Sequence, residues 1–347
     1  MSQPSSYVYA GVGRTKPEGL VGIFRRPAGG GAWEHVFAAA EVQAVTVHPK
    51  DRNIVFAGAK GGVLRSDDAG ATWSANGFPD AGAAIWSVMV HPEDSRIVLA
   101  GASPIGVFRS EDGGKSWRRL PDPRIAQRVA MPFPCRVMRF AVRPGRPEEI
   151  FAALEVSGVM RSTDLGETWE DCSDDLQRQS AEPHLKSRIA SDSEAEGMLD
   201  SHAIAMTPAA PEATFLAVRM GLFASTDAGR HWRDMHVGRF SPLTYGRDIR
   251  VSPQDPRVLY ACLSAAAFSV QGSLYRSDDV GETWRRFDRG TAPASTVMAV
   301  ALDAADAASV HIATRGGQVF GTLDGGATWT ETRLPPDTRD VYALASG

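Results

Sequence analysis

The sequence predicts an all-β fold, a seven-bladed β-propeller of four-stranded antiparallel blades, on three observations. An eight-residue pattern built from Ser, Asp, Gly, Thr and Trp recurs along nearly the whole chain. Four short strand-like runs fit between successive copies, which is the content of one propeller blade. The two ends of the chain each supply part of one further blade. We therefore expect one domain over residues 1–347, closed into a ring by its C-terminal strand.

The repeated pattern, called the box below, is clearest at 277–284, where it reads Ser-Asp-Asp-Val-Gly-Glu-Thr-Trp. The Ser and Asp oxygens can accept hydrogen bonds from turn N–H groups, and the Gly supplies a position with positive φ. An apolar run precedes each Ser and another begins at each Trp, so each box is expected to be a hairpin turn. Further copies lie at 66–73, 110–117, 162–169, 225–232 and 322–329, and a degenerate copy ends at Trp33.

The innermost strand of each blade is expected to end near a proline. The first example is Val45–Pro49, and the others end at Pro92, Pro144, Pro208 and Pro253, with Ala304 in the sixth copy. The seventh unit is divided between the chain ends: 7–11 has the pattern of a second strand, and 341–344 that of an inner strand. One C-terminal strand that completes three N-terminal strands would close the ring and leave no exposed edge.

These repeats resemble those of the Asp-box, or BNR-repeat, propeller superfamily, which includes sialidases, sortilin, xyloglucan-hydrolysing propellers and photosystem II assembly factors. The resemblance covers residues 7 to 346 and rests on five close boxes and one that begins with Thr322. It implies the propeller fold and places each box between the third and fourth strands, away from the ligand face. A fold of this kind does not by itself assign a function.

Departures from the repeat indicate where the functional face lies. The tryptophans at 33, 73, 117, 169, 232, 284 and 329 are 40, 44, 52, 63, 52 and 45 residues apart, so the extra length is mid-chain. It falls in three connections between an outer strand and the next inner strand: 120–135, 173–201 and 235–245. Long loops in compact domains are usually functional or disordered. We expect these loops to wall one side of the channel mouth on the ligand face, with 173–196 partly disordered.

Alignment of the inner strands on their proline reveals polar positions at the same mouth. Two and four residues before the proline, the side chains are apolar. Polar side chains appear six and eight residues before it, on the same side of the strand. This change indicates that each strand leaves the packed layer between blades and enters the mouth. The sixth-position set is Gln43, Trp86, Met138, His202, Arg247, Met298 and Arg339, and the eighth-position set is Glu41, Ala84, Arg136, Asp200, Tyr245, Thr296 and Asp337.

Three arginines of these sets are candidates for ligand binding. Arg136, Arg247 and Arg339 would lie on three blades around the mouth, which suits a carboxylate, sulfate or phosphate. The alternative is that they pair with carboxylates such as Asp200 and Asp337 and hold the loops in place.

Asp200, His202 and Tyr245 are the catalytic candidates. His202 titrates near neutrality, Asp200 could orient it or act separately, and Tyr245 could serve as nucleophile or proton donor beside an arginine. The alternative for His202 is a hydrogen-bonded structural role. Trp86 could stack on a sugar or aromatic ligand, or pack on the 120–135 loop.

Sialidases provide a comparison within the resembled superfamily. They use an arginine triad, a Tyr with a Glu partner and an Asp acid–base, roles that the arginine and catalytic candidates above could fill. This chain departs from them, because their Arg-Ile-Pro element belongs on an inner strand, whereas Phe24–Pro27 lies further out. A retaining glycosidase also needs its two reacting groups about 5 Å apart, which sequence does not establish.

Other chemistry is only weakly signalled. Arg139 and Asp248, one step deeper in their strands, are expected to form a structural pair. His184, His202 and His236 lie in or beside the long loops, but no HxH or HExxH spacing supports a metal site, and the cofactor is left open. There is no GxSxG, GKS/T, complete GxGxxG or CxxC motif, which removes the commonest nucleotide-binding and serine-hydrolase alternatives.

Bulk composition restricts the partners. Lys and Arg total 37 against 41 for Asp and Glu, a net charge of −4, which gives no support for nucleic-acid binding. No leader-like or long apolar stretch is seen, so we expect a soluble, cytoplasmic protein without a membrane partner. The three cysteines have neither metal-type spacing nor an even count, so reduced thiols are expected.

Two hypotheses for function follow. One is a hydrolase or lyase, glycosidase-like, that acts on a small anionic or carbohydrate-like ligand at the channel mouth. The other is a non-catalytic propeller that holds a protein partner on the long-loop face. A deep pocket with converging Arg, His and Asp would favour the enzyme, and a flat patch with those residues paired off would favour the binding protein.

Overall fold

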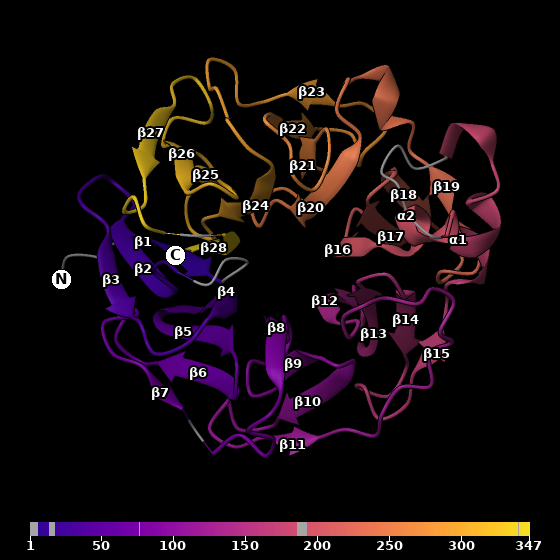
Figure 1. Ribbon diagram of the computed structural model, residues 1–347, viewed down its shortest axis with the longest axis horizontal. Helices are drawn as coiled ribbons and strands as arrows, with labels where there is room; N and C mark the ends of the chain where they lie inside the picture. The colour runs from indigo at the N-terminus through magenta and orange to yellow at the C-terminus, as the bar shows by residue number, and fades with distance from the viewer. Residues whose placement is uncertain (1–5, 14–17, 76, 186–192, 339) are drawn as a thin grey trace.

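The computed structural model describes residues 6–13, 18–75, 77–185, 193–338 and 340–347. Seven four-stranded antiparallel sheets are arranged in a ring. One edge strand of each sheet, called its inner strand, lies nearest the centre (Figure 1). This arrangement confirms the predicted seven-bladed propeller. None of the helices in the described ranges is long and apolar enough to cross a membrane.

The blades are numbered along the chain, and each is given from its inner to its outer strand. Blade 1 is β28 (Val341–Ser346), β1 (Tyr7–Val12), β2 (Gly22–Pro27) and β3 (Glu34–Phe37). Blade 2 is β4 (Val42–His48), β5 (Asp51–Ala59), β6 (Gly62–Ser66) and β7 (Ser74–Ala75). Blade 3 is β8 (Ala84–Val90), β9 (Val98–Ser103), β10 (Gly106–Ser110) and β11 (Arg118–Arg119).

The remaining blades follow the same order. Blade 4 is β12 (Val137–Arg143), β13 (Arg146–Leu154), β14 (Gly158–Ser162) and β15 (Glu170–Asp171). Blade 5 is β16 (Ser201–Thr207), β17 (Ala210–Val218), β18 (Gly221–Ser225) and β19 (Arg233–Asp234). Blade 6 is β20 (Tyr245–Val251), β21 (Leu259–Ser264), β22 (Gly272–Ser277) and β23 (Arg285–Arg286). Blade 7 is β24 (Val297–Leu302), β25 (Val310–Thr314), β26 (Gln318–Thr322) and β27 (Thr330–Arg333).

The ring closes through blade 1, where both chain ends meet (Figure 1). β28 pairs antiparallel with β1, for example Ala10 with Leu344. Tyr7 and Gly347 exchange backbone hydrogen bonds of 2.8 and 3.1 Å. The C-terminal strand thus completes the N-terminal blade, as predicted, and every inner strand has a hydrogen-bonded neighbour in its own sheet.

The boxes form the turns between third and fourth strands. In the copy at 66–73, the Ser66 Oγ accepts the Gly70 N–H at 2.8 Å, and Asp68 accepts the Thr72 N–H at 2.8 Å and its hydroxyl at 2.6 Å. These hydrogen bonds, chiefly that of the Thr72 hydroxyl, lower the pKa of Asp68 to about 2. Ala69 and Gly70 have φ of 55° and 76°. The same contacts recur at 110–117, 162–169, 225–232, 277–284 and 322–329, so the predicted turn chemistry is confirmed.

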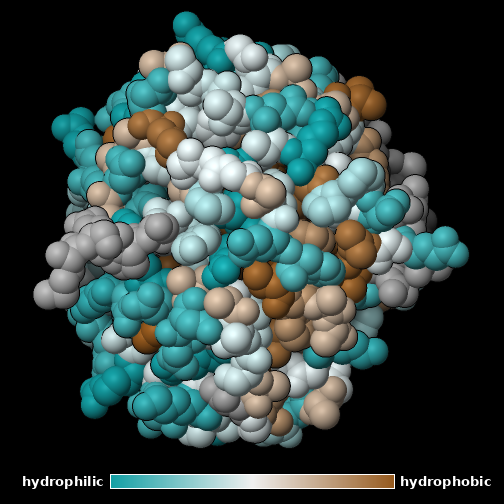
Figure 2. Space-filling model, turned by 90° about the vertical axis from the view of Figure 1, so that its left-hand side faces the viewer, coloured by the Kyte–Doolittle hydropathy of each residue, from teal (hydrophilic) through white to brown (hydrophobic). Residues whose placement is uncertain are grey.

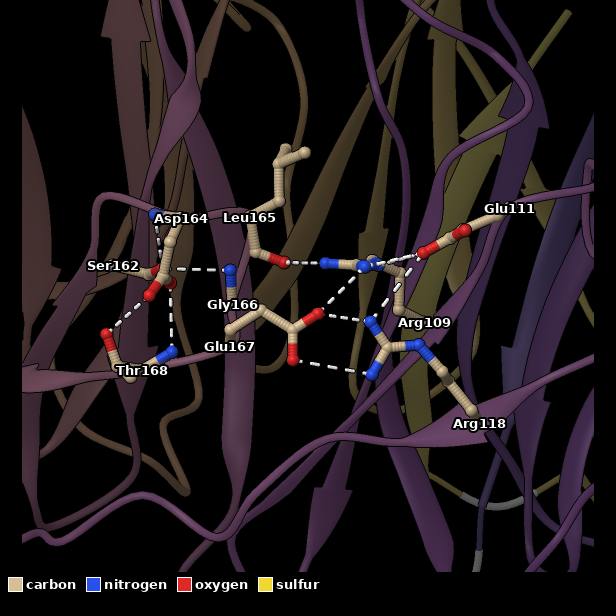
Figure 3. A network of polar contacts seen from close by, with 9 residues as sticks. All are labelled: Arg109, Glu111, Arg118, Ser162, Asp164, Leu165, Gly166, Glu167 and Thr168. Carbon is tan, nitrogen blue, oxygen red and sulfur yellow. Dashed lines mark hydrogen bonds and ion pairs between the residues drawn. The ribbon is translucent and has the colours of Figure 1, made fainter.

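Arginines link successive boxes (Figure 3). Arg109, directly before its box serine, donates from Nη1 to the Leu165 carbonyl in the next box at 2.8 Å. It also pairs with Glu167 of that box at 2.9 Å. The corresponding contacts are Arg25 to the Ala69 carbonyl and Arg65 to the Gly113 carbonyl. Each of these three arginines therefore joins the turn of one blade to that of the next.

The connection 173–201 is built into the core in its described parts. It contains α1 (Asp174–Gln179), the 3-10 turn η1 (Pro183–Leu185) and α2 (Ala195–Leu199). Leu176, Leu185 and Met198 are buried against blades 4 and 5. Residues 173–185 and 193–201 are thus ordered parts of the fold, and 186–192 lie outside the described residues. The connection 235–245 carries a second 3-10 turn, η2 (Val237–Arg239).

The outer surface is largely polar on the side where the ring closes. Figure 2 shows the molecule from the left-hand side of Figure 1, and this edge is mostly hydrophilic, with apolar residues gathered in one small area. Of the large apolar side chains in the described ranges, Phe268 and Val270 are the most exposed, at 77% and 85%. Both lie in the turn between β21 and β22, on the same face as the long connections.

Candidate functional site

Every inner strand carries a β-bulge at the same place. In blade 2, Val42 pairs with Ala59 and Ala44 with Gly58, so Gln43 is an extra residue without a partner in β5. The seven bulged residues line one narrow cavity of about 50 Å³ at the centre of the ring. They are Gln43, Trp86, Met138, His202, Arg247, Met298 and Tyr342.

The bulge explains the predicted sixth-position set and corrects its last member. One extra residue turns a side chain out of the packed interblade layer and toward the ring axis. Six of the seven predicted residues occupy the bulge. In the seventh strand the bulged residue is Tyr342 and not Arg339, which lies outside the described residues. The alignment was three residues out in β28, where no residue marks the proline position, and the eighth-position residue is accordingly Asp340 and not Asp337.

Arg136 is stacked and paired at the mouth. Its guanidinium carbon lies 3.8 Å from the ring centroid of Trp86 and 5.0 Å from that of Phe133. Its Nε is 2.5 Å from Oε2 of Glu155. Trp86 also meets Tyr342 edge-on, with centroids 5.4 Å apart. Trp86 and Arg136 thus form one cluster with the end of the 120–135 loop, which is the packing alternative for both residues.

Glu155 was missed by the sequence analysis. It follows β13 directly, and its N–H donates to the Arg136 carbonyl at 3.0 Å. Burial, and then the charge of Asp200, raise the pKa of its carboxyl to about 7 against the opposing charges of three arginines. This carboxyl therefore titrates near neutral pH. One feature of the sequence could have revealed Glu155, because it is a charged residue immediately after the second strand of its blade. Three other blades also have a charged residue there, namely Lys60, Arg219 and Arg315.

Asp200, His202 and Tyr245 form a buried cluster. The Nδ1 of His202 lies 2.7 Å from the Gly246 carbonyl, so Nδ1 carries a proton. Its Nε2 faces the Tyr245 hydroxyl at 3.2 Å and the Asp200 carboxylate at 3.3 Å. The side chains of His202 and Asp200 are only 2% and 6% exposed. The structure therefore brings the three catalytic candidates together, but below the surface of the mouth.

The protonation states of this cluster favour positioning over catalysis. Burial raises the pKa of Asp200, but the charges and hydrogen bonds of His202 and Arg219 outweigh burial and hold it well below its usual range. Arg219 binds Asp200 at 2.8 Å and Glu196 at 2.6 Å. Burial raises the pKa of Tyr245 to about 12, so this hydroxyl keeps its proton at neutral pH. A catalytic role for the three residues stays a prediction.

Arg247 is the candidate cation with no carboxylate partner. Its side chain lies in the central cavity and the residue is 8% exposed. In the described part of the chain, no carboxylate lies within ion-pair distance of it, and its buried Nε has no hydrogen-bond acceptor. A buried cation in this state favours an incoming anion.

The predicted pair of Arg139 and Asp248 is confirmed. The two side chains meet at 3.2 Å, although they come from blades 4 and 6. Asp248 is fully buried and also accepts the Val300 N–H of blade 7 at 3.2 Å. This contact ties three blades together next to Arg247.

A larger, mainly apolar groove lies beside the mouth on the long-loop face. Its volume is about 600 Å³, and the loop 120–135 forms much of its wall. Arg128 anchors the loop through ion pairs with Asp171 at 2.6 Å and Asp174 at 2.5 Å. The lining includes Ile105, Ile125, Val129, Met131, Phe133 and Ser157. Phe133 of this lining also contacts Arg136, with its ring centroid 5.0 Å from the guanidinium carbon.

The three histidines considered for a metal site do not converge. His184 and His236 both face Asp234, at 3.8 and 3.2 Å, whereas His202 faces Asp200. Over the described ranges, no group of three or more His, Cys, Asp or Glu side chains is placed to hold a metal ion.

Comparison with known proteins identifies the architecture. No family model and no curated protein matches the sequence. Among solved structures, a GH74 xyloglucanase from Xanthomonas campestris matches 94% of this chain and 47% of its own, with 19% identity and a TM-score of 0.63. A structure of YCF48 bound to D1 peptide matches 94% of this chain and 97% of its own, with 14% identity and a TM-score of 0.55. A putative 6-phosphogluconolactonase from Bacteroides uniformis matches 99% and 100%, with 16% identity and a TM-score of 0.62.

The likeness is one of fold. This chain spans about half the length of the GH74 structures it matches, and nearly the full length of the other two. The matches fit the superfamily resemblance of the boxes. The neighbours include both sugar-acting enzymes and a peptide-bound propeller, so the fold is compatible with either function.

Proposed function

We propose that this protein is a non-catalytic binding propeller that holds an extended segment of a protein partner on its long-loop face. A carboxylate of that segment would pair with Arg247 in the channel mouth. One observation carries the proposal: the acid–base candidates are buried and bonded to one another, while in the described part of the chain Arg247 has no ion-pair partner and its buried Nε has no hydrogen-bond acceptor. Such an arrangement is better suited to binding an anion than to turning over a substrate.

The groove supports a partner of this chemistry. Its volume of about 600 Å³ falls within the range of about 300–1,000 Å³ that is usual for ligand sites. Its lining is mostly aliphatic and aromatic, which suits apolar side chains of an extended segment. Arg136 contacts both Phe133 of the groove and Trp86 of the central cavity, so a segment that passes Arg136 could place apolar side chains in the groove and a carboxylate beside Arg247.

The peptide-bound neighbour adds support by analogy. YCF48 was solved with D1 peptide, and it matches this chain over nearly the whole of both. The GH74 chains contain about as much again beyond the matched part. The neighbours that match over nearly their full length include this peptide-bound propeller and a putative 6-phosphogluconolactonase.

A hydrolase is the second candidate, and Glu155 is the observation that favours it. A carboxyl whose pKa is raised to about 7 can donate a proton at neutral pH. In this alternative, Glu155 and not Asp200 would be the general acid toward a sugar-like or small anionic substrate. The pairing of Glu155 with Arg136 would have to open during binding.

The test uses a short apolar peptide with a free C-terminal carboxylate and the same peptide as its C-terminal amide. We expect the carboxylate form to bind about tenfold more tightly or better, measured by calorimetry and by Trp86 fluorescence. Arg247→Met should abolish this preference. Arg239→Met, an exposed arginine on the same face, is the matched control and should retain it.

Two results would contradict the binding proposal. One is equal affinity for the two peptides in the wild type, and the other is an unchanged preference in Arg247→Met. Release of reducing sugar from xyloglucan oligosaccharides that disappears in Glu155→Gln would instead establish the hydrolase.

A further inference from the structure

The contact between blades 7 and 1, called the seam below, is where the box is degenerate. Counted back from Trp33, Arg26 occupies the place of the box serine, Ala28 that of the aspartate and Ala32 that of the threonine. The other six boxes keep an aspartate that accepts turn N–H groups. The seam has therefore lost the negative charge of the aspartate position and gained a positive charge two residues earlier, at the serine position.

Blade 7 carries a matching change on its side of the seam. His311 on β25 occupies the position that is aromatic or aliphatic in the other blades, namely Tyr9, Phe56, Leu99, Phe151, Phe215 and Tyr260. Opposite it, Gly321 stands where five blades have an arginine before the box. A Cβ on Gly321 would lie 2.5 Å from Cδ2 of His311, so glycine is what makes room for the histidine.

These residues line a cavity of about 440 Å³. Arg26 is 8% and His311 5% exposed. In the described part of the chain, Arg26 has no carboxylate partner; it donates to the Pro27 carbonyl at 3.3 Å and lies 5.8 Å from the Trp33 ring centroid. The Nδ1 of His311 is buried without a hydrogen-bond partner. The other lining residues include Gly29, Gly30, Gly31, Asp324, Thr328, Thr330 and Thr332.

Arg26 leaves the cavity electrostatically incomplete, because no carboxylate in the described ranges pairs with it. Burial lowers the pKa of Arg26. Burial, and then the neighbouring Arg26 charge, lower the pKa of His311 to about 4 against the opposing charge of Asp303, so His311 is neutral at pH 7. Asp324 does not neutralise Arg26, because it accepts the Thr328 N–H at 2.9 Å and hydroxyl at 2.6 Å, and the Thr322 hydroxyl at 2.7 Å, within its own box. A buried charge is costly until an opposite charge reaches it.

We propose that the seam cavity binds a small tetrahedral oxyanion, phosphate or sulfate in type, between Arg26, His311 and the turn Gly29–Gly31. The anion would restore the negative charge that the aspartate supplies in the other boxes. Arg26 would donate to two of its oxygens, as guanidinium groups do with phosphate. The glycines leave open space, since a Cβ at Gly29 or Gly30 would meet no atom within 4 Å.

This site is independent of the proposed partner-binding function. The box turns and the long connections lie at opposite ends of the outer strands, and therefore on opposite faces of the ring. The seam is also where the chain ends are joined, because blade 1 takes its inner strand from the C-terminus. Binding at the seam should consequently stabilise ring closure, which makes thermal unfolding a suitable measurement.

The experiment compares inorganic phosphate and sulfate with chloride at equal ionic strength, using the full chain. Phosphate at a hundredfold excess over its Kd should raise Tm by about 3–4 °C, whereas chloride should not. Arg26→Ser restores the residue found in the other boxes, and we expect it to weaken phosphate binding by about tenfold or more in calorimetry. Arg25→Ser, the adjacent arginine on the other side of β2, is the matched control and should keep the phosphate response.

A second variant covers a failure of Arg26→Ser to fold. His311→Phe restores the aromatic residue of other blades and should also weaken phosphate binding while raising Tm in chloride. A parallel titration with phenyl phosphate distinguishes a free ion from the phosphate group of a larger molecule by which of the two binds more tightly. The proposal is overturned if phosphate and sulfate shift Tm no more than chloride, or if the folded Arg26 or His311 variant binds phosphate as the wild type does.

Discussion

The two faces of the ring use the same repeated backbone in different ways. On the box face, six turns repeat the same two backbone contacts, in which a Ser or Thr hydroxyl accepts the Gly N–H and an Asp carboxylate accepts the N–H of the residue before the Trp. On the long-loop face, two backbone positions also repeat, the bulge of each inner strand and the residue after each second strand, but their side chains differ from blade to blade. The repeated backbone therefore fixes the positions of these side chains. The chemistry of each position depends on the residue type, which is uniform in the boxes and variable on the long-loop face.

The largest expected effect tests whether the Asp200 cluster is structural. Asp200→Ala would leave the buried His202 without its carboxylate and Arg219 with Glu196 alone, so we expect a loss of about 3–5 kcal/mol in the free energy of unfolding. Urea denaturation measures this loss. Asp340→Ala, which removes another carboxylate of the mouth that is less buried, is the comparison and should cost less. A stable Asp200→Ala protein would show that the cluster does not hold this face together.

The next effect tests the box face through a glycine. Gly114 has φ of 83°, and a Cβ there would lie 2.4 Å from the Phe56 ring. Gly114→Ala should therefore cost about 2–4 kcal/mol, from backbone strain and overpacking together. Gly290→Ala is the matched control, since Gly290 has φ of 85° but open space around it, and it should cost only about 1 kcal/mol. Equal losses in the two variants would contradict the packing of Phe56 against the box.

The pH dependence of stability distinguishes Glu155, on the long-loop face, from the aspartates of the box face. Because its folded pKa is raised to about 7 from an ordinary value near 4.3, the native state holds a proton that the unfolded state releases. Stability from this group is therefore present at low pH and lost as pH rises from about 4.3 to about 7. Relative to Glu155→Gln, the wild type should lose about 1–3 kcal/mol between pH 5 and pH 8.

Chemical denaturation at pH 5, 6, 7 and 8 measures this difference. Glu331→Gln, a partly exposed glutamate on the outer strand β27, is the control and should show no such trend. The box aspartates have the opposite effect on the pH dependence of stability. The pKa of Asp68 is lowered to about 2, so its contribution to the free energy of unfolding is present above pH 4 and is lost on acidification. Parallel curves for the wild type and Glu155→Gln would rule out the raised pKa.

The smallest expected effect concerns the arginine links between boxes. Arg109→Met removes the hydrogen bond to Leu165 and the ion pair with Glu167, and should cost about 1–2 kcal/mol, because Arg109 is only 9% exposed. Arg233→Met removes an ion pair between two exposed side chains, which is worth about 0–1 kcal/mol. Thermal unfolding of the two variants compares them directly. Equal costs would mean that the links between boxes add no more than a surface ion pair.

Much of the candidate site could be predicted from sequence. The inner-strand alignment located six of the seven bulged residues, including Trp86, His202 and Arg247, because the bulge recurs at a constant distance from the proline. It missed Tyr342, since no residue after β28 marks the register. It also missed Glu155, because the position after each second strand recurs but its residue type changes from blade to blade. The stacking of Arg136 on Trp86 could not be predicted, because these residues are 50 positions apart and meet only when blades 3 and 4 pack together.

The sequence by itself determined the number of blades, the box turns and the closure of the ring. Those features depend on hydrogen bonds within eight residues and on the alternation of side chains along single strands, and both are local. Only the tertiary structure decided which charges are neutralised. Asp200 is paired with Arg219 and His202, whereas Arg247 and Arg26 have no ion-pair partner among the described residues. This outcome depends on burial and on distances between blades, and electrostatic energy is set by those quantities and not by neighbours in sequence.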